Sequence, residues 1–153
     1  MSKKLSKITD YFEGFHMYAI VSPLKDYSLG FHINNNLDFH LASYEDIYFD
    51  MASDPDKGFS WYYYEDQRSH THYYLIGNKS DGSFLIPAQK TVDYLLLIKD
   101  ALDDQAALDS ANAIRKIPNV SAVFSVDMNK VKDMDVFMET IELHELEFVK
   151  RSK

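Results

Sequence analysis

The 153-residue sequence contains no cysteine and only five glycines. Without cysteine, the chain has no disulfides, thiolate metal sites or cysteine nucleophiles, and this absence fits either a reducing compartment or simple disuse of the residue. The few glycines form no phosphate-binding loop, dinucleotide fingerprint or nucleophile elbow. No apolar run approaches the roughly 18 residues of a membrane helix, and no apolar signal core follows the lysines of residues 1–7. We therefore expect a cytoplasmic protein that does not contact a membrane.

Basic residues are scarce in the body of the chain. Of the sixteen Lys and Arg residues, six lie in two terminal stretches, about 1–7 and 150–153, which contain no acid. Residues 8–149 consequently carry ten basic and 24 acidic side chains, a net charge of −14. This charge would repel a nucleic acid over most of the surface. We expect basic, mobile tails on an acidic domain and no nucleic-acid partner.

The composition is that of one globular domain spanning residues 1–153, because 46% of the residues are hydrophobic and 26% are charged. Strand formers from Phe15 to Val21 precede Ser22-Pro23, which we interpret as the N-cap and first residue of a helix. That helix is expected to have a broad apolar face made of Leu24, Tyr27, Leu29, Phe31, Ile33 and Leu37.

Aromatic residues are concentrated in two stretches, Phe59 to Glu65 and Thr71 to Ile76, that bracket a polar link and predict a β-hairpin. Before them, residues 39–41 and 47–51 predict short strands. The aromatic side chains fall on both faces of the hairpin. One set belongs to the core, and the other is either shielded by the C-terminal segment or exposed as an interaction surface. Trp61 and Tyr63 are therefore candidate contacts for a protein partner or a second copy.

The second half of the chain gives the clearest succession of elements. Leu95 to Ile98 is a continuous apolar run, as expected of a central strand covered on both faces. Asp103 or Asp104 is expected to cap a helix with Ala107, Ala111 and Ile114 on one face. Residues 120–126 then alternate and predict a strand, with Val120, Ala122, Phe124 and Val126 on one side.

Residues 133–149 have apolar spacing that predicts another helix. The order of elements in the second half is similar to the later part of a ferredoxin-like domain. The predicted fold class is therefore α+β: a single domain with a largely antiparallel sheet and two or three helices.

An anomalous acid, Asp93, precedes the apolar run, and Pro87 stands shortly before it. Pro87 cannot donate to a sheet ladder, so we expect it at the start of a strand or on an edge. Asp93 is a poor strand former, and a partly buried carboxylate needs a partner. The candidate donors are Arg68, Lys90, a tyrosine hydroxyl or backbone amides. Tyr94 would point to the opposite face, into the core.

The segment resembles the motif of the IPExxxVDY family of small bacterial proteins. The matching residues are Ile86, Pro87, Val92, Asp93 and Tyr94, whereas Ala88 stands where the family has glutamate. The resemblance implies a small domain of about this length and no particular activity. The missing carboxylate argues against a paired-carboxylate mechanism at this motif. Either the family glutamate is structural, or this chain lacks a function that the family has.

Six histidines raise the question of a metal site, and His70 and His72 would share one face of a strand at a spacing that can chelate. The stretch from His144 to Phe148 departs from the HExxH zinc motif at its last position. The stretch Asp54–Gly58 lacks the glycine and glutamate positions of a calcium loop and is typical of a turn. We expect no metal and no cofactor.

Three functions stay open at this point. The first is a non-catalytic protein-interaction or self-association module that acts through the aromatic hairpin and the edge around Pro87. The second is a small-ligand regulatory domain with a pocket between the sheet and a helix over 104–117. In that case Asp93, Arg68, His70 or His72 would supply polar contacts. The third is an enzyme that uses Asp93; it is favoured least, and no catalytic residue is assigned.

Overall fold

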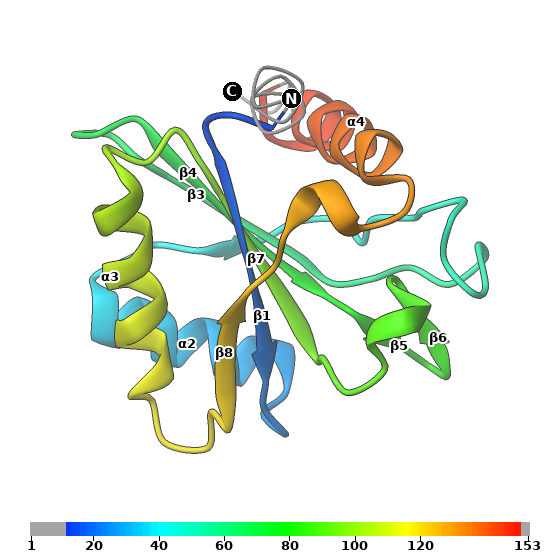
Figure 1. Ribbon diagram of the computed structural model, residues 1–153, viewed down its shortest axis with the longest axis horizontal. Helices are drawn as coiled ribbons and strands as arrows, with labels where there is room; N and C mark the ends of the chain where they lie inside the picture. Colours follow the sequence, from blue (N-terminus) through cyan, green and yellow to red (C-terminus); the bar gives the residue numbers. More distant parts are fainter. Residues whose placement is uncertain (1–11, 151–153) are drawn as a thin grey trace, which may run out of the picture.

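Six antiparallel strands form one sheet in the computed structural model, which describes residues 12–150 (Figure 1). The strand order is β2-β3-β4-β7-β1-β8. The bounds are β1 (Phe15–Val21), β2 (Ala42–Ser43), β3 (Trp61–Asp66), β4 (Thr71–Gly77), β7 (Tyr94–Lys99) and β8 (Ala122–Ser125). β7 lies between β4 and β1, so the prediction that Leu95 to Ile98 forms a central strand is confirmed.

Three α-helices flank the sheet: α2 (Asp26–Leu37), α3 (Asp104–Arg115) and α4 (Met134–Glu145). The remaining elements are the small hairpin β5 (Lys79–Ser80) and β6 (Ser83–Phe84), the 3-10 turns η1 (Pro87–Gln89) and η2 (Met128–Lys130), and the π-helical turn η3 (Leu146–Lys150). This is the single α+β domain that the sequence predicts. Among residues 12–150, no helix has the length and apolar composition needed to cross a bilayer.

The chain order of the main elements is βαββαβ, given by β1, α2, β4, β7, α3 and β8. This is the order of a ferredoxin-like domain, with β2 and β3 added beyond β4. The likeness therefore includes the first half of the chain and is not confined to the second.

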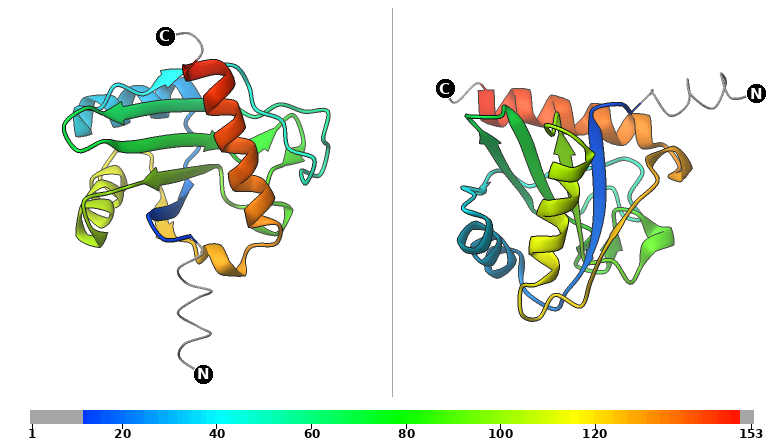
Figure 2. Two further views of the ribbon diagram at one scale, coloured as in Figure 1. Left: turned by 90° about the horizontal axis from the view of Figure 1, so that it is seen from above. Right: turned by 60° about the vertical axis from the view of Figure 1, so that its left-hand side comes forward.

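The sheet is buried on both faces, with α2 and α3 on one side and α4 on the other (Figure 2). Tyr62, Leu96 and Ile98 pack with the first pair of helices, whereas Trp61, Leu95 and Leu97 pack with α4. Side chains alternate between the two faces of a sheet along each strand. A strand that is covered on both faces therefore has apolar residues on both, and its sequence does not show which face each residue is on. The aromatic hairpin β3–β4 is such a pair of strands.

Several local predictions place the start of an element, or the width of its buried face, wrongly. Ser22-Pro23 does not start α2, because Lys25 is the N-cap residue and the helix begins at Asp26. The apolar face of α2 is narrower than predicted: Leu29 and Ile33 are buried, whereas Tyr27 and Phe31 are 67% and 60% exposed. At Gly30 the helix lies against the Tyr62 ring, and a Cβ there would make an ordinary van der Waals contact, 3.6 Å from Cε2 of Tyr62.

Two short strands and one strand face also differ from expectation. Residues 39–41 and 47–51 form no extended strands; the strand in this region is β2, and Ile47 makes only an isolated bridge with Phe59. In β8, Val123 is buried and Phe124 is 41% exposed, the reverse of the predicted alternation. β8 is a four-residue edge strand, so Phe124 is only partly covered.

Candidate functional site

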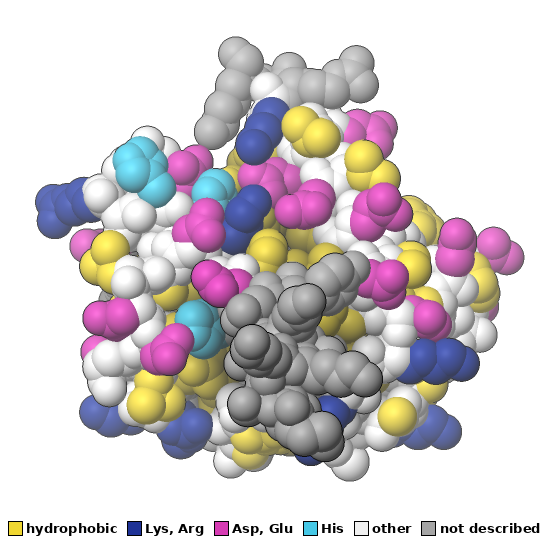
Figure 3. Space-filling model, turned by 45° about the horizontal axis from the view of Figure 1, so that its top comes forward, with side chains coloured by type: hydrophobic (Ala, Val, Ile, Leu, Met, Phe, Trp, Pro, Cys, Tyr) yellow, Lys and Arg dark blue, Asp and Glu magenta, His cyan; other side chains and the backbone are white. Residues whose placement is uncertain are grey.

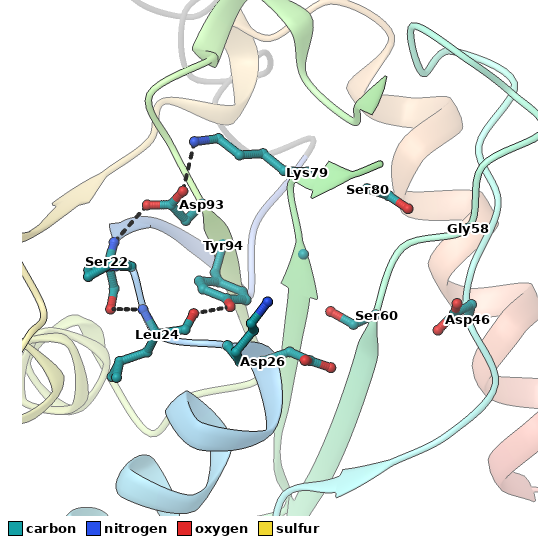
Figure 4. A pocket seen from close by; sticks show the side chains of 13 residues that line it. Ser22, Leu24, Asp26, Asp46, Gly58, Ser60, Lys79, Ser80, Asp93 and Tyr94 are labelled. Atoms are coloured by element: carbon teal, nitrogen blue, oxygen red, sulfur yellow. Dashed lines mark hydrogen bonds and ion pairs between the residues drawn. The ribbon is translucent and has the colours of Figure 1, made fainter. Parts of the chain in front are cut away.

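A cleft of about 410 Å³ opens at the end of the sheet where β1 ends and β7 begins (Figure 4). Its walls come from the β1–α2 connection, the start of β7, the end of β4 and the segments before β3. They are Ser22, Pro23, Leu24, Lys25, Asp26, Asp46, Gly58, Ser60, Gly77, Lys79, Ser80, Asp93 and Tyr94. Volumes of this size are typical of small-molecule sites.

Asp93 lies at one wall of this cleft, half-buried, with both carboxylate oxygens paired. Oδ2 accepts a hydrogen bond from the Ser22 amide at 2.7 Å, and Oδ1 lies 2.7 Å from the Lys79 ammonium. The prediction that Asp93 requires a partner is confirmed, and one partner is a backbone amide. The charged partner, however, is Lys79 and neither Arg68 nor Lys90, because the β4–β5 connection passes directly beside β7.

The β1–α2 connection is held in place from both sides. The Ser22 hydroxyl donates to the Asn119 carbonyl at 2.8 Å and accepts from the Leu24 amide at 3.2 Å. The Tyr94 hydroxyl donates to the Leu24 carbonyl, and burial raises the pKa of Tyr94 above its ordinary range. Tyr94 is buried, as predicted. These contacts fix the wall of the cleft and leave the Tyr94 hydroxyl neutral.

Asn78 holds in place residues 86–94, the segment that resembles the IPExxxVDY motif and is called the motif segment below. This fully buried side chain donates to the carbonyls of Gln89 and Val92 at 3.0 and 2.8 Å, and its oxygen accepts from the Ile86 amide at 2.8 Å. Its backbone amide also donates to the Asp93 carbonyl at 2.9 Å. Sequence reasoning missed this residue, since the only signal is an asparagine at the end of a strand next to a turn. Asn78 thus positions Asp93 without lining the cleft.

The motif segment is irregular before β7 begins. Pro87 starts the 3-10 turn η1 and is exposed, so its predicted place at a strand start or edge is wrong. Asp93 precedes β7 and is not within it. A 3-10 turn needs no amide at its first residue, which suits proline. Ala88 is exposed in the same turn and does not line the cleft.

The opposite wall carries two further carboxylates. Asp26, in the first turn of α2, accepts a hydrogen bond from the Tyr62 hydroxyl at 3.0 Å through Oδ2. Burial, aided by Asp26, raises the pKa of Tyr62 to about 12. Asp46 is exposed and makes no side-chain hydrogen bond or ion pair within residues 12–150. Gly77 also lines the cleft, and a side chain there would collide with Ser60, because a Cβ would lie 2.8 Å from the Ser60 hydroxyl oxygen.

The structure does not bring the other predicted site residues to this cleft. Trp61 and Tyr63 are 0% and 5% exposed, so the aromatic hairpin is core and not an interaction surface. The C-terminal helix α4 covers this face, which is the shielding alternative that the sequence left open. Arg68 and His70 lie at the β3–β4 turn, level with the far end of β7, because His72 pairs with Lys99 and Gly77 with Tyr94.

The two histidines do not form a chelate. His70 has a left-handed backbone, with φ of 59°, and precedes β4, whereas His72 lies within it. The His72 Nδ1 atom is 2.6 Å from the Tyr63 hydroxyl. Within the part of the chain that the structure describes, no three His, Asp or Glu side chains are arranged to hold a metal ion.

The predicted pocket between the sheet and the helix over 104–117 is also wrong. Ala107, Ala111 and Ile114 of α3 are buried and pack directly against the sheet. The cleft opens instead beside the start of α2. Asp103 caps α3 by accepting from the Ala106 amide at 2.8 Å, as predicted.

A second polar cluster lies inside the molecule, under α4. Glu145 is 3% exposed, and its Oε1 accepts from the Tyr74 hydroxyl at 2.6 Å. Its Oε2 is buried without a hydrogen bond, 3.7 Å from the Lys150 ammonium and 3.9 Å from the His72 ring. Burial raises the pKa values of Tyr63 and Tyr74 far above their ordinary range. This cluster joins α4 to the hairpin.

Comparison of this chain with protein-family models, with curated proteins and with solved structures finds no match. The resemblance of residues 86–94 to the IPExxxVDY motif therefore stays a prediction.

Proposed function

We propose that this domain binds a small polar molecule in the cleft beside Asp93 and does not transform it. One observation carries the proposal: five segments that are distant in sequence converge on one cleft of about 410 Å³, and the motif's Asp93 is fixed at its wall. The aromatic hairpin is buried, so the interaction module that the sequence favoured first has lost its surface there.

The free groups in the cleft suit a ligand that donates hydrogen bonds or carries a positive charge. Lys79 is already paired with Asp93. Asp46 has no partner within residues 12–150, and Asp26 uses only Oδ2. Ser60 and Ser80 add two hydroxyls to the lining. Three carboxylates against two lysines leave the cleft negative, which favours an amine or an amino acid over an anion.

Asp93 and the tyrosines at the cleft are engaged in ways that argue against a catalytic role for these three groups. Both oxygens of Asp93 are paired, and the hydroxyls of Tyr62 and Tyr94 already donate to protein acceptors. A general base needs a carboxylate or imidazole that is free to accept the substrate's proton. The predictions of a cytoplasmic location and of no nucleic-acid partner accompany this proposal and stay predictions.

Thermal-shift measurements with a panel of amino acids, polyamines, sugars and nucleotides test the proposal. A ligand that binds the folded state raises the unfolding temperature in a saturable way. We expect saturable stabilisation by at least one amine-bearing compound. The variant Asp26→Asn/Asp46→Asn should lower its affinity about tenfold or more, because two charge-assisted contacts are lost.

Asp50→Asn is the matched control, since Asp50 is an exposed acid in the same region that does not line the cleft. Its affinity for the same compound should equal that of the unaltered chain. The proposal fails if no compound stabilises the protein, or if the double variant binds as tightly as the control.

A further inference from the structure

The outer face of α4 carries a line of exposed apolar side chains. Val136 is 44% exposed, Leu143 is 60% exposed and Leu146, just after α4, is 52% exposed. Val136 and Leu143 are two helical turns apart, and Leu146 follows one turn later, so the three lie along one side. The inner face is already fully used, because Phe137, Met138 and Ile141 pack into the core. The exposed apolar side chains on the outer face therefore do not contribute to the core.

Two grooves border this line, one on each side of α4. The first, of about 430 Å³, is lined by Phe12, Phe15, Val136 and Met138 together with acids of α4. The second, of about 420 Å³, lies between α4 and residues 45–48 and is lined by Ile47, Tyr48, Leu143 and Phe148. Tyr48 is 57% exposed. Single exposed apolar residues need no explanation, whereas a line of them between two grooves is typical of a docking surface.

Acidic side chains surround the apolar line. Asp135, Glu139 and Glu147 are exposed, and none forms an ion pair with a lysine or arginine within residues 12–150. Glu142 is the exception, with its carboxylate 3.9 Å from the Lys99 ammonium. Figure 3 shows this surface, where hydrophobic side chains alternate with Asp and Glu. Unpaired acids beside an apolar line favour a partner with the opposite charge.

We propose that this face of α4 binds a basic amphipathic helix of another protein. The partner helix would place apolar side chains at a spacing of three and four residues along Val136, Leu143 and Leu146. Its flanking Lys or Arg residues would pair with Asp135, Glu139 and Glu147. A second copy of this chain does not fit, because a two-fold pairing of α4 with itself would set these acids against one another. The second groove shares Asp46 with the Asp93 cleft, but none of the apolar or acidic side chains assigned to the partner helix lines that cleft.

The probe for a first test is a synthetic Leu/Lys helix of about 14 residues, roughly 21 Å long, with leucines on one face. Titration of the full chain, followed by calorimetry at about 0.1 M salt, should show saturable binding with one peptide per chain. A scrambled peptide of the same composition, and a Leu/Glu peptide with the same apolar spacing, should bind at least about tenfold more weakly.

Variants of the chain locate the binding. Leu143→Gln/Leu146→Gln should weaken the Leu/Lys helix about tenfold or more. Glu139→Lys/Glu147→Lys should do the same, with a difference that shrinks as salt increases. The controls are Leu102→Gln, a 76% exposed apolar residue before α3, and Asp50→Lys, an exposed acid outside α4. Both should leave the affinity unchanged. Circular dichroism of each variant checks that it is folded.

Three results would overturn the proposal. One is no saturable binding of the Leu/Lys helix. Another is binding that the α4 variants do not weaken more than the controls. The third is a dimer in analytical ultracentrifugation that Leu143→Gln/Leu146→Gln dissociates, because the occupant would then be a second copy. None of these results depends on the cleft, so this surface and the proposed ligand site can fail separately.

Discussion

Asp93 and Glu145 are two partly or fully buried carboxylates that the fold treats in opposite ways. Asp93 has both oxygens paired at 2.7 Å and lies at the wall of an open cleft. Glu145 is almost completely buried, with one oxygen bonded to Tyr74 and the other without a hydrogen bond. One carboxylate is fully satisfied beside solvent, and the other is incompletely satisfied away from it.

The difference separates a binding role from a structural role. A ligand can reach the groups around Asp93, whereas Glu145 lines neither that cleft nor the two grooves beside α4. Burying a carboxylate is costly unless its hydrogen bonds are made. Glu145 therefore acts through specificity: it fixes how α4 lies on the hairpin, because its partners across that contact, Tyr74 and His72, both belong to β4.

Replacing Asn78 by alanine should have the largest effect, because it releases the segment that holds Asp93. Three side-chain hydrogen bonds of a fully buried residue would be lost, leaving two carbonyls and one amide unpaired. We expect the free energy of unfolding to fall by about 4 kcal/mol. Urea unfolding measures this. Asn36→Ala, on the exposed side of α2, is the control and should change stability by less than about 0.5 kcal/mol. A loss below about 1 kcal/mol for Asn78→Ala would show that the motif segment is held by other contacts.

Breaking the Glu145 cluster should come second. Glu145→Ala leaves the Tyr74 hydroxyl buried without an acceptor, and Tyr74→Phe leaves the carboxylate without its short hydrogen bond. Each should lower the free energy of unfolding by about 3 kcal/mol. The double variant Tyr74→Phe/Glu145→Leu should lose much less than the sum, because both polar groups are removed together. Strict additivity in this double-mutant cycle would mean that the two residues do not act as a pair. Ligand binding in the cleft should be unchanged.

Asp93 itself should matter less for stability than Glu145. Asp93→Ala removes the acceptor of the Ser22 amide, and Ser22 is 2% exposed, so we expect a loss of about 1.5 kcal/mol. Lys79→Met should cost less than about 0.5 kcal/mol, because the Lys79 side chain is 42% exposed and water screens the pair. Urea unfolding of both variants tests this order. If Lys79→Met costs as much as Asp93→Ala, the ion pair and not the amide contact holds the motif.

Local signals predicted much of the fold. The central strand follows from an unbroken apolar run, the hairpin from two aromatic stretches around a polar link, and α3 from its Asp103 cap and its Ala107, Ala111 and Ile114 face. Asp81-Gly82, which joins β5 to β6, also carries a local signal, since both residues have positive φ, as a tight hairpin turn requires. In each case the residues that decide the structure are close together in the sequence.

The cleft was not predictable in the same way, because its contacts join distant segments. Ser22 and Asp93 are 71 residues apart, and Ser22 meets Asn119 at a separation of 97. The sequence also did not determine whether Trp61 and Tyr63 are buried or exposed, because it does not show which helix covers which face of β3. His70 seemed to share a strand face with His72, but its left-handed backbone ends the turn just before β4.

Acid should weaken the packing of α4 through His144. This buried ring contacts Trp61, and its Nε2 lies 2.8 Å from the Glu45 carbonyl; burial lowers its pKa below the ordinary value of about 6.5. The unfolded chain therefore binds a proton more readily than the folded one. The His144 contribution to stability is complete above about pH 6.5 and is lost as the pH falls towards the folded pKa. The slope from this one group is at most about 1.4 kcal/mol per pH unit.

The measurement is the free energy of unfolding at about pH 7.5 and about pH 5.5 for the unaltered chain and for His144→Asn. We expect a decrease on acidification that the variant lacks, and one proton can account for no more than about 1.4 kcal/mol of it per pH unit. His32→Asn, on α2, is the control and should retain the decrease. Equal decreases in the free energy of unfolding of all three proteins would assign the acid sensitivity to groups other than His144. The contacts of α4 would then contain no group that makes stability depend on pH.

The substitution Ala88→Glu, which would give residue 88 the glutamate of the motif that this segment resembles, should have the smallest effect. Ala88 is exposed in η1 and lies outside the cleft lining, so a carboxylate there has no buried partner to satisfy. We expect a change in stability within about 0.5 kcal/mol and no change in the affinity of the cleft for its ligand. Urea unfolding and calorimetry check the two expectations. Tighter ligand binding by this variant would show that position 88 contributes to recognition as well as Asp93.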